Sequence, residues 1–129
     1  MKSLSAVVSA VLIALAGTGC TGSRNTNLTP RDLPAAPDSS YLFETTFDSS
    51  RRGVDPASVK AWVMIDLTLY PMQRVPNTEN RFEALVPLPP GRNNIPYRYK
   101  FEFAFPGTPG RAVNSTWSQE YRLVLGGRQ

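Results

Sequence analysis

Apolar and polar residues alternate along most of the chain after residue 40, and this alternation predicts β-strands. Tyr41 to Phe47 places an aromatic or threonine side chain at every second position, as is typical of a half-buried strand. From Val59 to Tyr70 the side chains of one parity are all apolar, so we predict one long strand with a core face. Its opposite face carries Trp62, Met64 and Tyr70, which are then available to a partner.

Three further segments alternate in the same way: residues 81–88, 95–105 and 116–125. The second of them directs five aromatic rings to one side, and these are expected to dominate the core: Tyr97, Tyr99, Phe101, Phe103 and Phe105. Turns rich in proline and glycine separate the strands, and the chain has 12 prolines and 9 glycines. We therefore predict an all-β fold, an immunoglobulin-like antiparallel sandwich of about six or seven strands over residues 41–129.

The first 20 residues have the layout of a secretory signal. Lys2 supplies a positive charge, residues 4–16 are mostly apolar, and the small residues 17–19 precede Cys20. The apolar run is too short for a membrane span. Small residues directly before a cysteine make this segment resemble the lipobox of bacterial lipoproteins, although Gly17 stands where that family usually has leucine. The resemblance implies cleavage after residue 19, a lipid on the Cys20 sulfur and, from Thr21, location at an outer membrane.

The single cysteine cannot form an internal disulfide, and lipidation explains both its presence and its position. An alternative stays open, because residues 14–16 read Ala-Leu-Ala and form a site for ordinary signal cleavage, which would release a soluble periplasmic or secreted protein. In either case residues 20–40 lack apolar periodicity and predict a flexible linker ahead of the folded domain.

One resemblance has functional content. The segment 71–103 is similar to glycogen-binding domains of the early-set, immunoglobulin-like class in these residues: Phe82, Leu88, Pro90, Gly91, Tyr99, Lys100 and Phe101. Most of these positions belong to the scaffold of that class. Lys100 matches a sugar-binding position, and Tyr70 lies where that class has an asparagine-tryptophan segment. The resemblance implies binding of an α-glucan-like carbohydrate.

Composition excludes several other functions. The chain has no histidine, which removes Ser-His and Cys-His catalytic arrangements and most zinc sites. Its net charge is +4, but the arginines are scattered, so we expect no nucleic-acid partner. Asp48 and Asp55 flank a loop that also contains Arg51 and Arg52, which indicates a turn and not a calcium site. We expect no enzyme activity and no cofactor.

The candidate binding residues are therefore the aromatic, sulfur-containing and basic side chains expected on sheet faces: Trp62, Met64, Tyr70, Lys100 and Trp117. Tryptophan is common both in cores and in contact surfaces. If Trp62 and its neighbours are open to solvent, they form a patch of the kind that marks an interface. The sequence thus predicts a membrane-anchored, non-catalytic module that contacts another protein of the cell envelope, with glycan binding as the alternative.

Overall fold

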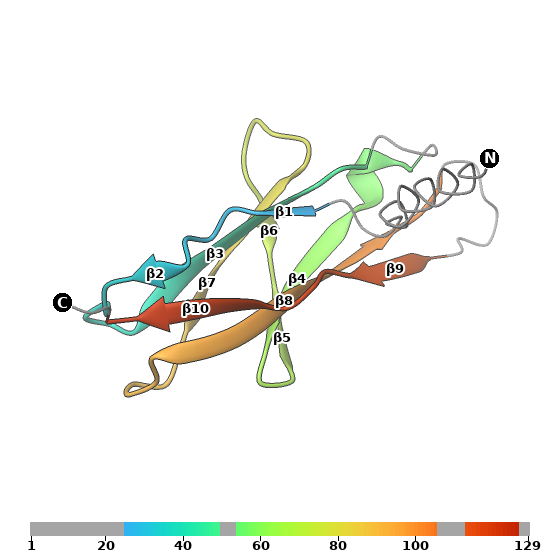
Figure 1. Cartoon of the computed structure of the whole chain (residues 1–129). Helices are drawn as coiled ribbons and strands as arrows, with labels where there is room; N and C mark the ends of the chain where they lie inside the picture. Colours follow the sequence, from blue (N-terminus) through green and yellow to red (C-terminus); the bar gives the residue numbers. More distant parts are fainter. Residues whose placement is uncertain (1–24, 50–53, 106–112, 127–129) are drawn as a thin grey trace, which may run out of the picture.

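The computed structural model describes residues 25–49, 54–105 and 113–126, whose strands form two sheets packed face to face (Figure 1). The first sheet has four strands, and each hydrogen-bonds to its neighbour in an antiparallel arrangement. In spatial order these are β1 (Asn25–Asn27), β3 (Ser40–Phe47), β7 (Arg81–Pro87) and β6 (Gln73–Arg74).

The second sheet has six strands and is built around β8, its longest member. Its spatial order is β2 (Asp32–Leu33), β10 (Tyr121–Leu125), β8 (Asn94–Phe103), β4 (Lys60–Ile65) and β5 (Thr68–Pro71), and β9 (Asn114–Trp117) also pairs with β8. A short 3-10 helix, η3 (Pro56–Ser58), precedes β4. All pairs are antiparallel except β2 with β10.

The strand order is that of the immunoglobulin fold. Strands β1, β3, β7 and β6 occupy the places of A, B, E and D in that fold, while β4, β8 and β10 occupy those of C, F and G. This arrangement confirms the predicted all-β, immunoglobulin-like sandwich. Ten strands appear in the described residues, where about six or seven were expected, because several of them are only two to four residues long.

The core consists of the inward-facing side chains that the alternation predicted in β3, β7 and β8. The fully buried members with the largest side chains are Tyr97, Tyr99, Phe43 and Phe101. Aromatic pairs join the two sheets, with ring centroids 4.9 Å apart for Phe43 and Tyr97 and 4.4 Å apart for Phe47 and Phe101. Such pairs contribute about 0.5–1.5 kcal/mol each beyond the burial of their area. They connect strands B and F, which a disulfide joins in antibody domains.

The expectation of a flexible linker is wrong for residues 25–40. β1 pairs with β3 of the first sheet, and β2 pairs with β10 of the second. The polar side chains of this segment are used inside the fold: Asn27 Nδ2 donates to the Tyr97 hydroxyl at 2.8 Å, and the Thr29 hydroxyl lies 2.9 Å from that of Tyr99. A segment without apolar periodicity is thus ordered because it satisfies buried tyrosine hydroxyls.

Burial also changes the acidity of these tyrosines. Removal from water raises the pKa of Tyr99 above its ordinary value, and it raises the pKa of Tyr97 in the same direction. Hydrogen bonds from Asn27 and Thr29 partly oppose the shift at Tyr97. Both phenols therefore stay protonated and neutral in the folded protein at physiological pH.

The prediction of one strand from Val59 to Tyr70 is also wrong. Strand β4 ends at Ile65, and β5 runs back beside it as the second arm of a hairpin. Asp66 and Leu67 form the two-residue turn and have positive φ angles of 52° and 67°. Two successive positive φ angles are the mark of the type I′ turn that fits the twist of a hairpin.

This turn exchanges the two faces of the segment. Val63 lies opposite Tyr70, and Met64 lies opposite Leu69. Tyr70 therefore shares the inner face of the sheet with Val63 and packs partly buried against the core. It does not share the outer face of Trp62, as the sequence predicted.

The expected strand from Thr116 to Leu125 is divided at Ser118, which is buried. Ser118 donates its amide hydrogen to the Tyr99 carbonyl at 2.9 Å, and its hydroxyl oxygen accepts from the Tyr99 amide at 2.9 Å. The interruption shifts the alternation. Leu123 faces the core after it, whereas Trp117 lies opposite Lys100 on the outer face before it.

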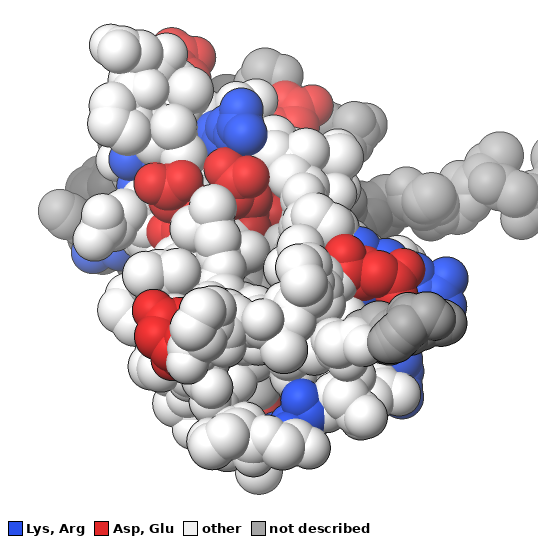
Figure 2. All heavy atoms as spheres, turned by 90° about the vertical axis from the view of Figure 1, so that its left-hand side faces the viewer, with Lys and Arg blue, Asp and Glu red and all other residues white. Residues whose placement is uncertain are grey.

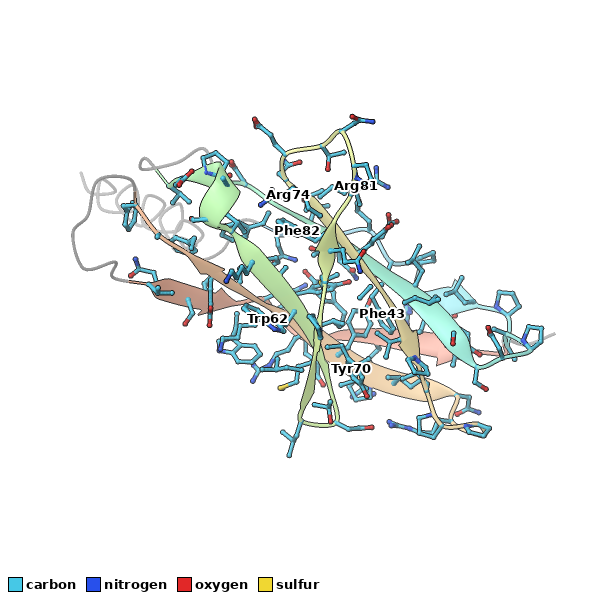
Figure 3. All side chains as sticks on the ribbon, turned by 180° about the vertical axis from the view of Figure 1, so that it is seen from behind. Phe43, Trp62, Tyr70, Arg74, Arg81 and Phe82 are labelled. Atoms are coloured by element: carbon cyan, nitrogen blue, oxygen red, sulfur yellow. The ribbon has the colours of Figure 1, made fainter. Side chains whose placement is uncertain are left out.

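One arginine connects the two sheets at their margin. Arg74 of β6 donates to the carbonyls of Pro56 at 3.0 Å and Val59 at 3.2 Å, which lie next to the second sheet. Its guanidinium also bonds the Glu79 carbonyl and lies 4.8 Å from the ring centroid of Phe82 (Figure 3). Arg74 therefore fixes η3 and the β6–β7 hairpin relative to each other.

Residues 1–24, which include the predicted signal and Cys20, lie outside the described residues. Within the described part of the chain, no helix has the length and apolar character needed to cross a membrane.

Candidate functional site

The outer face of the second sheet brings together most of the side chains that the sequence singled out. In the strand register, Trp62 of β4 lies opposite Lys100 of β8, and Lys100 lies opposite Trp117 of β9. These three side chains form one row across adjacent strands. Since neighbouring strands are about 4.8 Å apart, the backbones at Trp62 and Trp117 are separated by roughly 10 Å.

Met64 and Arg98 lie opposite each other in the next row, on the same outer face. We call the five residues Trp62, Met64, Arg98, Lys100 and Trp117 the tryptophan strip. The strip comes from β4, β8 and β9, which are neighbouring strands of the second sheet. Pro71 and Leu69 of β5 continue the two rows at one side.

Cations lie against both indole rings of the strip. The Lys100 ammonium is 5.7 Å from the ring centroid of Trp62 and 5.7 Å from that of Trp117. The guanidinium carbon of Arg98 is 4.5 Å from the Trp117 ring centroid. Such contacts contribute about 0.5–1 kcal/mol at exposed sites. They favour arrangements in which the cations stay against the ring faces.

The strip is open to solvent at one end and half-buried at the other. Trp117 has a relative exposure of 38%, which is large for a tryptophan. Trp62, Met64 and Lys100 are of intermediate exposure. Lys100 also pairs with Glu102 at 3.4 Å, so its charge is partly balanced.

Of the predicted binding residues, the structure brings together Trp62, Met64, Lys100 and Trp117, and it separates Tyr70 from them. Figure 3 shows Trp62 and Tyr70 on the two arms of the β4–β5 hairpin. Arg98 was not among the predicted residues. Its position two residues before Lys100 in an alternating strand places both on one face, and this signal could have identified it.

A shallow depression adjoins the strip at the Met64 and Arg98 end. It is lined by Met64, Asp66, Leu67, Pro96, Tyr97, Arg98 and Glu120. Leu67 at the tip of the hairpin is 87% exposed. The depression therefore combines apolar walls with one cation and two carboxylates.

On the face shown in Figure 2, acidic and basic side chains are interspersed among uncharged ones. Among the described residues, no three side chains of the metal-binding types lie close enough together to hold an ion. The tryptophan strip is thus the surface with the most distinctive chemistry in the described part of the chain.

No family model matches the chain, and no curated protein matches its sequence. Among solved structures, the chain is similar to the major subunit of aggregative adherence fimbriae type I from Escherichia coli, with 14% sequence identity and a TM-score of 0.35. The superposition covers 80% of this chain and 93% of the fimbrial subunit. A likeness at this identity and TM-score does not extend to function, so the function must be inferred from the residues of this chain.

Proposed function

We propose that this protein is a non-catalytic contact module that binds another protein of the cell envelope through the tryptophan strip. The observation that carries the proposal is the row of Trp62, Lys100 and Trp117, with Arg98 stacked on the second indole. Tryptophan and arginine are the residue types most often responsible for binding energy in protein interfaces. Here they are gathered on the outer face of one sheet.

The short strands at the sheet margins favour use of this face over addition of a partner strand. In the first sheet the outer strands β1 and β6 are three and two residues long. In the second sheet β2 has two residues, and β5 ends at Pro71, which has no amide hydrogen to donate. Short edges and prolines are features that protect a sheet against further strand pairing.

We further propose that a lipid on Cys20 holds the module at the outer membrane. The support is the sequence layout, in which the only cysteine of the chain follows an apolar run and three small residues. Phase partitioning in a cloud-point detergent tests this point. The parent protein should enter the detergent phase, and Cys20→Ser should stay in the aqueous phase. Aqueous partitioning of both would favour cleavage after Ala16 and a soluble product.

The test of the contact function compares capture of proteins from detergent-solubilised envelopes by the full chain and by its variants. Trp62→Ala and Trp117→Ala should each lose the captured protein. Leu85→Ala is the matched control, because Leu85 is 65% exposed on the outer face of the other sheet. Thermal melts establish that each variant is folded. Equal capture by all folded variants would contradict the proposal.

Glycan binding is the second candidate, and one observation favours it. Two indole rings lie in one row with a lysine between them, an arrangement in which rings can stack on sugar faces while the lysine bonds hydroxyl groups. Both tryptophans of the chain belong to the strip, so intrinsic fluorescence reports on it directly. A change in emission on titration with soluble α-glucans, absent in Lys100→Ala, would support this candidate over a protein partner.

A further inference from the structure

We infer that the partner presents a carboxylate to Arg98, flanked by an apolar side chain that enters the neighbouring depression. This inference rests on the proposed contact function and adds the chemistry of the segment that is bound. Three observations support it: the Arg98 guanidinium has no hydrogen-bond partner among the described residues, basic side chains lie near it, and the depression beside it has apolar walls.

Arg98 is the cation of the strip whose hydrogen-bond donors are free. Its guanidinium lies over the Trp117 ring at 4.5 Å, and among the described residues it makes no hydrogen bond or ion pair. The guanidinium carbon lies over the ring, and the N–H groups have no acceptor among the described residues, so they can donate to a ligand. A planar group held in this way is ready to bind a carboxylate with two parallel hydrogen bonds.

The charges on this face favour an acidic ligand at the strip. The outward-facing charged residues of β4 and β8 are Lys60, Arg98, Lys100 and Glu102, of which three are basic. Glu102 is already engaged by Lys100. Asp66 and Glu120 line the depression beside Arg98, so the attraction for an incoming carboxylate comes from Arg98 itself and from Lys100, two residues further along the same face of β8.

The depression determines what stands beside that carboxylate. Its apolar lining is Met64, Leu67 and Pro96, which suits an aliphatic side chain. Asp66 and Glu120 lie on the same lining and would repel a second acidic group. Asp66 already binds Arg92, so that arginine does not offer a second free site for an anion. The partner segment that fits this surface thus has one acidic residue, which binds Arg98, next to an apolar residue, which enters the depression. The residue after the apolar one is not acidic.

The experiment uses the full chain in detergent and an end-capped peptide probe with one glutamate next to a leucine in an otherwise neutral sequence. The matched probe has glutamine in place of the glutamate. Tryptophan emission measures binding, since both tryptophans lie in the strip. We expect the glutamate probe to bind more tightly than the glutamine probe and to weaken as salt is raised.

Two substitutions and one control define the role of Arg98. Arg98→Gln should weaken binding of the glutamate probe about ten- to a hundredfold. Arg98→Lys keeps the charge but loses the planar fork, so its affinity should fall between those of the parent and Arg98→Gln. Arg81→Gln should leave binding unchanged, because Arg81 lies in β7 of the other sheet, where it pairs with Glu44.

Equal binding of the two probes, or parent-like binding by folded Arg98→Gln, would overturn the inference. The capture of envelope proteins tests the proposed contact function independently of the peptide experiment. A partner lost in Trp62→Ala but retained by Arg98→Gln would keep the contact function and reject the carboxylate. Capture that depends on neither tryptophan would reject the contact function itself.

Discussion

The Tyr99 hydroxyl donates a hydrogen bond to Asn27 Oδ1 at 2.7 Å across a separation of 72 residues in the chain. It also lies 3.1 Å from the carbonyl oxygen of Glu44, so a single phenol contacts the N-terminal segment and β3 from within β8. Since Tyr99 is fully buried, these polar groups have no water to replace it. The N-terminal segment is therefore held by the interior of the sandwich as well as by its strand hydrogen bonds.

Tyr99→Phe should lower the free energy of unfolding by about 0.5–1.5 kcal/mol, because it removes the hydrogen bond to Asn27 Oδ1, while that oxygen and the Glu44 carbonyl keep the Thr29 and Leu28 amides as donors. Urea unfolding followed by circular dichroism measures the change. Tyr70→Phe is the control, since Tyr70 is half-buried and makes no hydrogen bond among the described residues, and it should change stability by less than about 0.5 kcal/mol. Equal effects of the two substitutions would contradict the role given to the Tyr99 hydroxyl.

Stability should fall as the pH rises above about 10. Burial raises the pKa of Tyr99 above the ordinary value of 10.0, so the unfolded chain releases this proton at lower pH than the folded protein. The contribution of the protonated Tyr99 to the free energy of unfolding is complete below the pKa that this tyrosine has in the unfolded chain. It is lost as the pH rises beyond that value. Urea unfolding at a series of alkaline pH values measures how the unfolding midpoint changes with pH. This change should be smaller in Tyr99→Phe than in the parent protein. A midpoint independent of pH in this range would refute the expectation.

Leu67→Gly should stabilise the protein by about 1 kcal/mol, because leucine is strained in the left-handed region and glycine is not. Leu67 has a φ of 67° and is 87% exposed, so its removal costs little buried area. The melting temperature should rise by several degrees. Asp66→Gly is the comparison. Its melting temperature should rise less than that of Leu67→Gly, because the substitution also removes the ion pair with Arg92. A lower melting temperature in Leu67→Gly would show that its side chain makes a contact that its exposure does not reveal.

Arg74→Met should lower the free energy of unfolding by about 1.5–3 kcal/mol, because it removes charge-assisted hydrogen bonds to the carbonyls of Pro56 and Val59. Arg81→Met is the matched control on the next strand. The ion pair of Arg81 with Glu44 at 3.2 Å is partly exposed, so its loss should cost at most about 1 kcal/mol. Chemical unfolding of both variants provides the measurement. A larger loss of stability in Arg81→Met than in Arg74→Met would contradict the conclusion that Arg74 contributes more to the stability of the fold.

Strict alternation predicted the strands whose one face is core and whose other face is solvent. Phe43 in β3, Val86 in β7 and Phe101 in β8 are buried as expected, because each of these strands keeps a single register along its length. The all-β class and the immunoglobulin-like sandwich follow from these three segments together with the turns between them.

The alternation failed at two places where the chain changes direction or register without a glycine or proline. Asp66 and Leu67 form a tight turn in which a glycine is usually found at the second position, and the pattern runs through it unbroken. Ser118 interrupts the last strand by bonding the backbone of Tyr99, a contact that depends on a residue distant in sequence. The first break explains why Tyr70 lies on a face other than the predicted one, and the second explains why the expected strand from Thr116 to Leu125 is divided.

The candidate site was predictable in part for the same reason. Trp62 and Met64 precede the hairpin turn and therefore kept their predicted outer face, and Lys100 lies in the uninterrupted β8. The proximity of Trp117 to Lys100 depends on pairing between β9 and β8, which no local pattern encodes.

The path of the N-terminal segment has a mechanical consequence. β1 belongs to one sheet and β2 to the other, while side chains of Asn25 and Asn27 bond Tyr121 and Tyr97 across the interior. Tension applied to the chain ahead of Asn25 is therefore divided between both sheets by residues 25–33. If the protein is tethered at its N-terminal side while a partner holds the tryptophan strip, the segment that bears the load is also the one that clamps the two halves of the sandwich together.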